Sequence, residues 1–261
     1  MRIRHFTKYK VTFGNYIFYK NFEGITGNKK MLIDNYNKVK ANIDAAAKRV
    51  GRNPEEITLV AVSKTKPLEC IEELAAEGVM EFGENKPQEL KQKYESVSKP
   101  VHFHQIGHLQ TNKVKYIIDK AVLIHSVDSI HLAETIEKEA VKHGIKADVL
   151  IEVNYAEEDS KFGVKKEEVL PLIKEISEKF KSVNIKGLMT IAPFVSDPEE
   201  NRDLFKGMHE LLLDIKSENI DNVDMDILSM GMTNDYVVAV EEGATMVRVG
   251  TAIFGERNYN L

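Results

Sequence analysis

Short apolar runs and amphipathic stretches alternate along most of the chain. The first amphipathic stretch, residues 33–50, has Val39 and Ile43 at helical spacing and is followed by Gly51, a helix stop signal. Eight apolar runs of strand length follow, at residues 57–63, 79–83, 101–106, 121–126, 147–153, 185–190, 225–230 and 244–249. Amphipathic segments such as 129–143 and 165–180 separate them. Strands that alternate with helix-length segments indicate βα units in a parallel sheet.

Eight such units are enough to close a parallel sheet into a barrel. A complete (β/α)8 barrel takes about 250 residues, and the chain has 261. The alternative is an open doubly wound sheet, but no GxGxxG fingerprint follows the first predicted strand. We therefore predict an α/β fold, a (β/α)8 TIM-type barrel formed by a single domain at residues 31–261, with 33–50 as an extra N-terminal helix.

Residues 1–30 differ from the rest of the chain in charge and aromatic content. They hold seven Lys or Arg residues against one acid, Glu23, and lack the apolar core of a secretory signal. We interpret them as an N-terminal extension, disordered or arising from a mis-annotated start, with Met31 as the initiator. The alternative is an amphipathic arm for a partner or a membrane surface.

Composition narrows the classes of function. The net charge of −5 gives no reason to expect nucleic acid as a partner. No apolar run approaches the roughly 20 residues that span a bilayer, so no membrane partner is expected. A single cysteine, Cys70, cannot form an internal disulfide and favours a cytoplasmic location. We expect a monomer or a weak dimer.

A lysine ends the first predicted strand of the barrel. In the sequence VAVSKTKP, Val60, Val62 and Lys64 alternate with Leu59, Ala61 and Ser63, so the two sets lie on opposite faces. If the two valines point into the barrel, Lys64 points into its mouth, where a desolvated amine is a nucleophile for a carbonyl group. The alternative is a lysine that marks the exit of the strand to solvent.

Polar residues also end the next two predicted strands. The sequence FGEN places Glu84 and Asn85 at a helix start, and HFHQIGH places His102 and His104 on one strand face, with His108 beyond. A metal site is conceivable for three histidines, but no carboxylate or thiolate with ligand spacing accompanies them. The favoured interpretation is that His104 packs in the barrel and the other two are structural or surface groups.

The last two predicted strands lead into Gly- and Thr-containing turns. The sequence LSMGMTNDY predicts a helix capped by Thr233, and VRVGTAIFG places Arg248 inside a strand and Thr251 just beyond it. Loops after strands seven and eight of such barrels frequently bind phosphate, because N–H groups at helix starts lack partners. The alternative for either loop alone is a helix cap with a tight turn. Arg248 needs a partner, since a charge within a short strand is costly to bury.

Together these motifs resemble, in order, those of the pyridoxal-phosphate homeostasis proteins, single-domain relatives of the alanine racemase N-terminal barrel. The resemblance runs from about residue 33 to the end of the chain. It is carried by VAVSKTKP, FGEN, IGHLQTNK, HSVDS, SKFGV, GLMTIAP, LSMGMTNDY and VRVGTAIFG. Thr233 departs from the serine that is frequent in the family but keeps the hydroxyl.

The resemblance implies that pyridoxal 5'-phosphate is the cofactor and that Lys64 carries it as an internal aldimine. It also implies that Arg248 faces the pyridine nitrogen and that Asn85 neighbours the ring. The residues implied around the phosphate are Met232, Thr233, Gly250 and Thr251. His104 and Ser229 are expected to line the same mouth.

The resemblance favours a carrier and regulator of the cofactor in intracellular vitamin B6 and amino-acid homeostasis. Apo-enzymes that receive the cofactor would then be partners. An arginine at the pyridine nitrogen disfavours ring protonation and so weakens the ring as an electron sink. Racemases of this fold also have a C-terminal β-domain, for which the chain leaves no room after Thr251. The alternatives are a small pyridoxal-phosphate-dependent amino-acid racemase and, less favoured, a lysine Schiff-base aldolase.

Overall fold

The computed structural model describes residues 10–13, 16–19, 25–158 and 161–256. Its strands are β1 (Lys10–Phe13), β2 (Tyr16–Tyr19), β3 (Thr58–Val62), β4 (Glu81–Glu84), β5 (His102–Gln105), β6 (Ala121–Val127), β7 (Ala147–Glu152), β8 (Val183–Met189), β9 (Val223–Ser229) and β10 (Met246–Val249). Its α-helices are α1 (Ile25–Arg49), α2 (Leu68–Ala76), α3 (Pro87–Ser96), α4 (Ile130–His143), α5 (Lys166–Lys179), α6 (Arg202–Ser217), α7 (Tyr236–Glu241) and α8 (Thr251–Phe254). Three short 3-10 helices complete the described elements, η1 (Pro54–Glu56), η2 (Thr111–Tyr116) and η3 (Pro198–Asn201).

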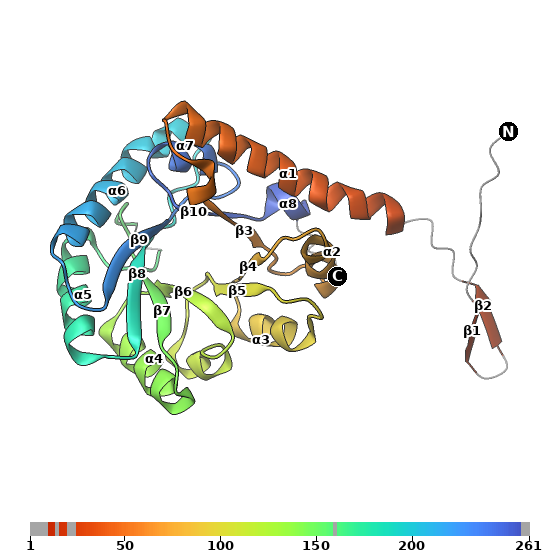
Figure 1. Cartoon of the computed structure of the whole chain (residues 1–261), viewed down its shortest axis with the longest axis horizontal. Coiled ribbons are helices and arrows are strands. Elements are labelled where there is room, and N and C mark those ends of the chain that lie inside the picture. Colours follow the sequence, from red (N-terminus) through yellow and green to blue (C-terminus); the bar gives the residue numbers. More distant parts are fainter. Residues whose placement is uncertain (1–9, 14–15, 20–24, 159–160, 257–261) are drawn as a thin grey trace.

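Strands β3 to β10 form one closed parallel barrel, in the order β10-β3-β4-β5-β6-β7-β8-β9 (Figure 1). The predicted fold class is confirmed, and each predicted strand overlaps an observed one. In place of a regular α-helix, η2 follows β5. Within the described ranges, no helix combines the length and apolarity that a membrane crossing requires.

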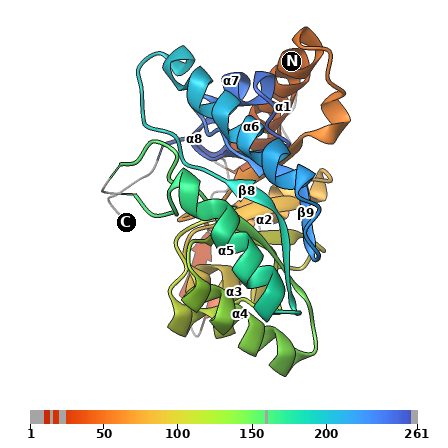
Figure 2. The same ribbon diagram turned by 90° about the vertical axis from the view of Figure 1, so that its left-hand side faces the viewer.

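Two layers of apolar side chains make up the core. The inner layer joins residues from strands around the barrel, namely Val60, Leu123, Leu150, Met189 and Met246. The larger outer layer lies between the sheet and the helices and includes Leu59 and Ala61. In Figure 2, α5 and α6 cover the outside of the β8 and β9 side of the barrel. Neighbouring residues such as Leu59 and Val60 of β3 belong to different layers, as strand geometry requires.

The helices follow local sequence signals, and α4 shows how. Ser129 precedes the helix, and its hydroxyl accepts a hydrogen bond from the Leu132 N–H at 3.3 Å. Gly144 ends it in the left-handed conformation, with φ of 66°. A polar cap at the start and a glycine at the end are the standard helix boundaries.

The added helix α1 begins at Ile25, eight residues before the predicted start at residue 33, so it crosses the expected domain boundary between residues 30 and 31. It lies against α7 and α8 at the closing side of the barrel (Figure 1). Asn35 donates to the Ile253 carbonyl at 3.1 Å, and Asn42 donates to the Tyr236 hydroxyl at 2.9 Å. Before α1, β1 and β2 pair as an antiparallel ribbon. The remainder of the predicted extension, and residues 257–261 of the predicted barrel domain, lie outside the described residues.

Candidate functional site

Lys64 lies in the turn that follows β3 at the carboxyl end of the barrel. Val60, four residues earlier, belongs to the inner layer, while Leu59 and Ala61 belong to the outer one. The predicted alternation of the strand is therefore confirmed. Lys64 is half-buried. Lys66, two residues on, donates instead to the carbonyl oxygens of Phe254, Gly255 and Glu256 at 2.9, 3.2 and 3.0 Å.

Asn85 lies beyond the neighbouring strand, β4, at the same end of the barrel. Gln105 donates to the Asn85 carbonyl oxygen at 2.9 Å. Gly107 is in close contact with Asn85, because a Cβ at Gly107 would lie 2.7 Å from the Asn85 carbonyl oxygen and 3.0 Å from its Cγ. A glycine at position 107 thus lets the loop after β5 pack directly on Asn85.

A chain of polar side chains runs through the barrel from the buried Arg248 to the half-buried Glu81. The guanidinium of Arg248 donates to the Ser229 hydroxyl at 2.5 Å and to the Thr190 carbonyl at 2.8 Å. His125 Nδ1 lies 3.0 Å from the same hydroxyl, and its Nε2 lies 3.0 Å from His104 Nδ1. His104 Nε2 lies 2.7 Å from Glu81 Oε2. We call these five side chains the core chain: Glu81, His104, His125, Ser229 and Arg248.

Burial and neighbouring charges determine the protonation of His125 and Glu81 in the core chain. Burial, assisted by His104 and Arg248, lowers the pKa of His125 well below 6.5, so this imidazole is neutral. Burial acts to raise the pKa of Glu81, but hydrogen bonds from His104 and His102 outweigh it, and the pKa falls. An ionised Glu81 requires a proton on His104 Nε2. Glu81 therefore accepts a hydrogen bond from His104, and the neutral His125 donates through one ring nitrogen and accepts through the other.

The core chain corrects the expectation for His104. His104 lines a cavity of about 360 Å³ with Asp148 and Asp224, each the second residue of its strand. His104 therefore opens toward the end of the barrel opposite Lys64, and hydrogen bonds through His125 and Ser229 connect it to Arg248. Ser229, the last residue of β9, is buried and bonds Arg248 directly.

Arg248 is almost fully buried, with 4% of its surface exposed. Burial lowers the pKa of Arg248 to about 10, an effect that the nearby carboxylates Glu152 and Asp235 partly oppose. Its two hydrogen bonds to described residues use two of the five N–H groups that a guanidinium carries. The side chain is thus held by neutral oxygens, with capacity for a further acceptor.

Glu152 is a mouth residue that the predicted site omitted. It ends β7, with Leu150 of the inner layer two residues before it, and its Oε2 accepts no hydrogen bond from the described residues. Burial, assisted by Asp128 and opposed by Arg248, raises the pKa of Glu152 to about 7. In the closed strand order β7 lies opposite β3, the strand that precedes Lys64. Glu152 ends an apolar run of the sequence, and the same signal identified Lys64.

The loop after β9 is built around Gly231 and Asp235. Gly231 has φ of +89°, and a Cβ there would lie 2.6 Å from the Ala239 Cβ. Asp235 accepts a hydrogen bond from the Met232 N–H at 2.7 Å, and α7 begins one residue later. The prediction that Thr233 caps this helix is wrong, because residues 233–235 form a turn before it. Met232 is exposed and Thr233 is half-buried.

The loop after β10 lies against the end of β3. A Cβ at Gly250 would lie 3.3 Å from the Val62 carbonyl oxygen, closer than most real Cβ contacts. Thr251 follows as the first residue of α8 and is exposed. Because Gly250 touches the strand that leads into Lys64, the last loop of the barrel and the lysine turn are neighbours.

The other two histidines of this region, His102 in β5 and His108 in the loop after it, point elsewhere. His102 is exposed and pairs with Glu81 at 2.7 Å, whereas His108 lies 3.6 Å from Asp128 and stacks on Phe162. Among the described residues, no group of three or more His, Cys, Asp or Glu side chains could hold a metal ion.

Comparison with known proteins places the chain in a family. Residues 35–258 match the family described as alanine racemase, N-terminal domain. A pyridoxal phosphate homeostasis protein of Aquifex aeolicus is 45% identical over 223 residues, which cover 85% of this chain and 96% of that protein. An unknown protein from Bifidobacterium adolescentis has a crystal structure with a TM-score of 0.82 and 34% identity, covering 88% and 96% of the two chains. PipY of Synechococcus elongatus PCC7942, solved with pyridoxal phosphate bound, has a TM-score of 0.71 and 31% identity, covering 82% and 100%. The chain therefore belongs to the alanine racemase N-terminal domain family and, within it, to the pyridoxal phosphate homeostasis proteins.

Proposed function

We propose that this chain binds pyridoxal 5'-phosphate covalently on Lys64 and carries it in the cytoplasm. Its role would be to buffer and deliver the cofactor in vitamin B6 and amino-acid homeostasis, with apo-enzymes as recipients. The names of its relatives and the ligand of PipY support the binding function. The observation that carries the proposal is the convergence of a lysine, a buried arginine and two glycine-containing loops at one end of the barrel.

The residues at this end of the barrel offer hydrogen-bond donors that match the ring nitrogen and the phosphate of the cofactor. Arg248 offers N–H groups to the pyridine nitrogen, since two neutral oxygens already hold it in place. The N–H groups of Thr233 and Asn234 donate to no described residue, so the loop after β9 has donors for a phosphate. The threonine hydroxyls at 233 and 251 add further donors. Asn85 and the backbone of Met232 border the same mouth.

The bound cofactor supplies an aldehyde and an electron-withdrawing ring. Lys64 would supply the amine that holds the cofactor through its aldehyde group. Arg248 would offer a hydrogen bond to the ring nitrogen and so disfavour protonation of that nitrogen. A ring held in this state suits storage and delivery better than removal of a proton from an amino acid.

Replacement of Lys64 tests the proposal. We expect Lys64→Ala to abolish covalent attachment entirely and to leave the barrel folded, because the residue lies in a turn outside both core layers. Borohydride reduction and peptide mass mapping give the measurement. Lys66→Ala is the matched control and should keep the label on Lys64, since three carbonyl oxygens hold the Lys66 ammonium. A label on Lys66 in the unmutated protein would contradict the assignment.

One observation favours the racemase alternative. Glu152, with a pKa of about 7, lies on the strand opposite that of Lys64, so the mouth holds a second group that can exchange protons. Incubation of the loaded protein with L-amino acids separates the two functions. We expect binding without sustained formation of D-enantiomers, and turnover above about 1 per second would favour a racemase.

A further inference from the structure

The turn that carries Lys64 has an unfavourable backbone conformation. The Lys66 N–H donates to the Ser63 carbonyl at 3.0 Å and closes a four-residue turn. Thr65, its third residue, has φ of +64°. That position in a type II turn usually holds glycine, and a β-branched residue with positive φ is strained. Strain of this kind persists only where the surroundings hold the backbone in place.

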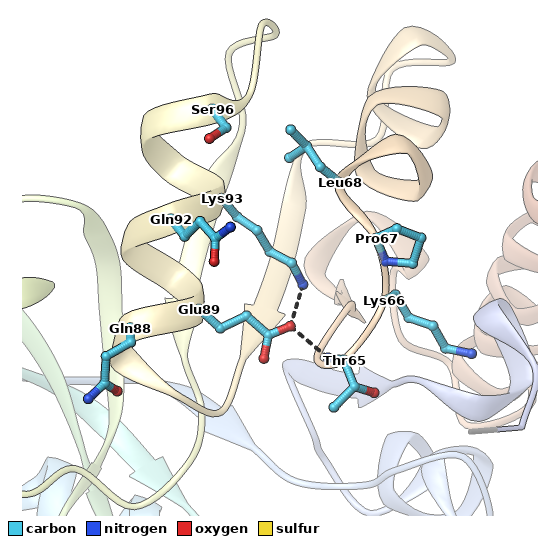
Figure 3. A pocket seen from close by; sticks show the side chains of 9 residues that line it. All are labelled: Thr65, Lys66, Pro67, Leu68, Gln88, Glu89, Gln92, Lys93 and Ser96. Carbon is cyan, nitrogen blue, oxygen red and sulfur yellow. Dashed lines mark hydrogen bonds and ion pairs between the residues drawn. The ribbon is translucent and has the colours of Figure 1, made fainter. Parts of the chain in front are cut away.

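A glutamate of α3 supplies the contact that holds Thr65. Glu89 Oε1 accepts a hydrogen bond from the Thr65 N–H at 2.7 Å and another from Lys93 Nζ at 2.7 Å. Figure 3 shows both interactions, with Glu89 lying between Lys93 of its own helix and the turn. The carboxylate thus joins the strained residue to a buried ammonium group.

Lys93 fixes the other side of Lys64. Its Nζ donates to the Ser63 carbonyl at 2.8 Å and to Glu84 Oε1 at 2.7 Å, in addition to Glu89. The Ser63 hydroxyl donates to the same Glu84 oxygen at 2.6 Å. Lys93 is buried, and its three N–H groups are all used. We call this group the turn clamp: Ser63, Glu84, Glu89 and Lys93.

We propose that Glu89 and Lys93 are positioning residues that fix the backbone on both sides of Lys64 and so orient its amine toward the cofactor. The proposal rests on the proposed function, in which Lys64 carries pyridoxal phosphate. Lys93 holds the residue before Lys64 through the Ser63 carbonyl, and Glu89 holds the residue after it through the Thr65 N–H. Without the Glu89 contact, Thr65 would relax toward negative φ and turn the lysine away from its reactive orientation.

Two members of the turn clamp, Glu89 and Lys93, border the outer surface. They form part of the lining of a groove of about 650 Å³ between α2 and α3, together with Pro67, Gln88 and Gln92 (Figure 3). Glu89 is half-buried at this groove, whereas Glu84 is fully buried beneath it. Truncating Glu89 leaves the Lys93–Glu84 ion pair intact.

The test compares Glu89→Ala, Thr65→Gly and the double variant in the full-length chain. The rate of covalent attachment is measured by adding pyridoxal phosphate to cofactor-depleted protein and trapping the Lys64 product with borohydride over time. We expect Glu89→Ala to slow attachment about tenfold, the equivalent of backbone strain of ~1.4 kcal/mol. Glycine accepts positive φ without strain, so the double variant should react within about twofold of Thr65→Gly.

Three controls separate positioning from a general effect on the fold. Glu95→Ala removes an exposed carboxylate from the same helix, where it pairs with Lys91 at 3.7 Å, and should react at the unmutated rate. With Lys64→Ala in the background, Glu89→Ala should leave noncovalent cofactor affinity unchanged. Glu89→Gln keeps an oxygen that can accept from Thr65 and should react within about threefold of the unmutated rate.

An unmutated rate in Glu89→Ala, or a loss that Thr65→Gly does not restore, would overturn the proposal. If Glu89→Ala does not fold, the test uses Glu89→Gln instead. A tenfold slower attachment in Glu89→Gln that Thr65→Gly does not restore would also overturn the proposal. Failure of the proposed function looks different, because the unmutated chain would then show no label on Lys64.

Discussion

The core chain and the turn clamp are both buried polar networks, but they differ in how completely their cations are paired. In the turn clamp, Lys93 donates all three of its N–H groups to described residues, two of them to carboxylates. In the core chain, Arg248 is held by a hydroxyl and a carbonyl, with only two of five N–H groups used among the described residues. A saturated cation stabilises the fold, whereas an unsaturated one at a mouth can bind a ligand. We therefore expect the same kind of mutation to affect stability in one network and affinity in the other.

Lys93→Met should cause the largest effect, because it leaves Glu84 buried without its counter-ion. Burial already raises the pKa of Glu84, and Lys93 is the main group opposing that rise. Breaking a buried pair by removing one partner costs about 3–5 kcal/mol of unfolding free energy. Urea unfolding at neutral pH measures the loss. Lys91→Met, on the same helix in an exposed pair with Glu95, should cost less than about 1 kcal/mol. Equal losses in the two variants would show that the turn clamp is not a buried ion-pair network.

Glu152→Gln should remove a pH dependence of stability that originates in the mouth. Burial raises the pKa of Glu152 from 4.5 to about 7, so between these values the folded protein holds a proton that the unfolded chain has released. This contribution is fully present below about pH 4.5 and is lost as the pH rises through about 7. Its upper limit is on the order of 3 kcal/mol. Glutamine stays neutral, so the variant should gain stability relative to the unmutated protein between about pH 5 and pH 8. A constant difference across this range would contradict the assignment.

Arg248→Ala should weaken cofactor binding without unfolding the protein. Loss of a hydrogen bond from a charged donor costs about 1.5–3 kcal/mol, or roughly tenfold to a hundredfold in affinity. Equilibrium titration with pyridoxal phosphate and the visible spectrum of the bound cofactor are the measurements. Arg49→Ala, which removes an exposed arginine of α1, should change neither. An unchanged affinity in Arg248→Ala would show that this arginine serves the stability of the fold and does not bind the cofactor. The two networks would then not differ in function.

The elements that could be predicted from sequence are those whose signal lies in a single strand. Strands covered on both faces read as continuous apolar runs, which is why all eight were found. Lys64 and Arg248 stood out because each is a charge at the end of such a run or within it. Glu152 carries the same signal at the end of residues 147–152 and could have been identified in this way.

Features that depend on the height of a residue inside the barrel could not be predicted. Alternation places His104 on the inner face of β5, but strand tilt and stagger decide toward which end it opens. Glu89 and Lys93 resemble the solvated face of a helix, and only the packing of α3 against β4 and β5 buries the lysine. Thr233 resembled a helix cap, but in the structure Asp235 directly precedes α7 and its carboxylate accepts a hydrogen bond from the Met232 N–H. The sequence pattern does not distinguish between these two arrangements.

The packing of α1 has a consequence for when a newly made chain can first bind its ligand. This helix is synthesised before every strand of the barrel, yet its hydrogen-bond partners Ile253 and Tyr236 are 218 and 194 residues further along the chain. Strand β10, which pairs with β3 and closes the barrel, is also the last strand to be made. Contacts this distant in sequence form slowly and late. Closure of the barrel, docking of α1 and completion of the loops after β9 and β10 therefore require the chain to be made at least as far as Ile253, so the nascent protein completes the proposed binding site only after β10 has emerged.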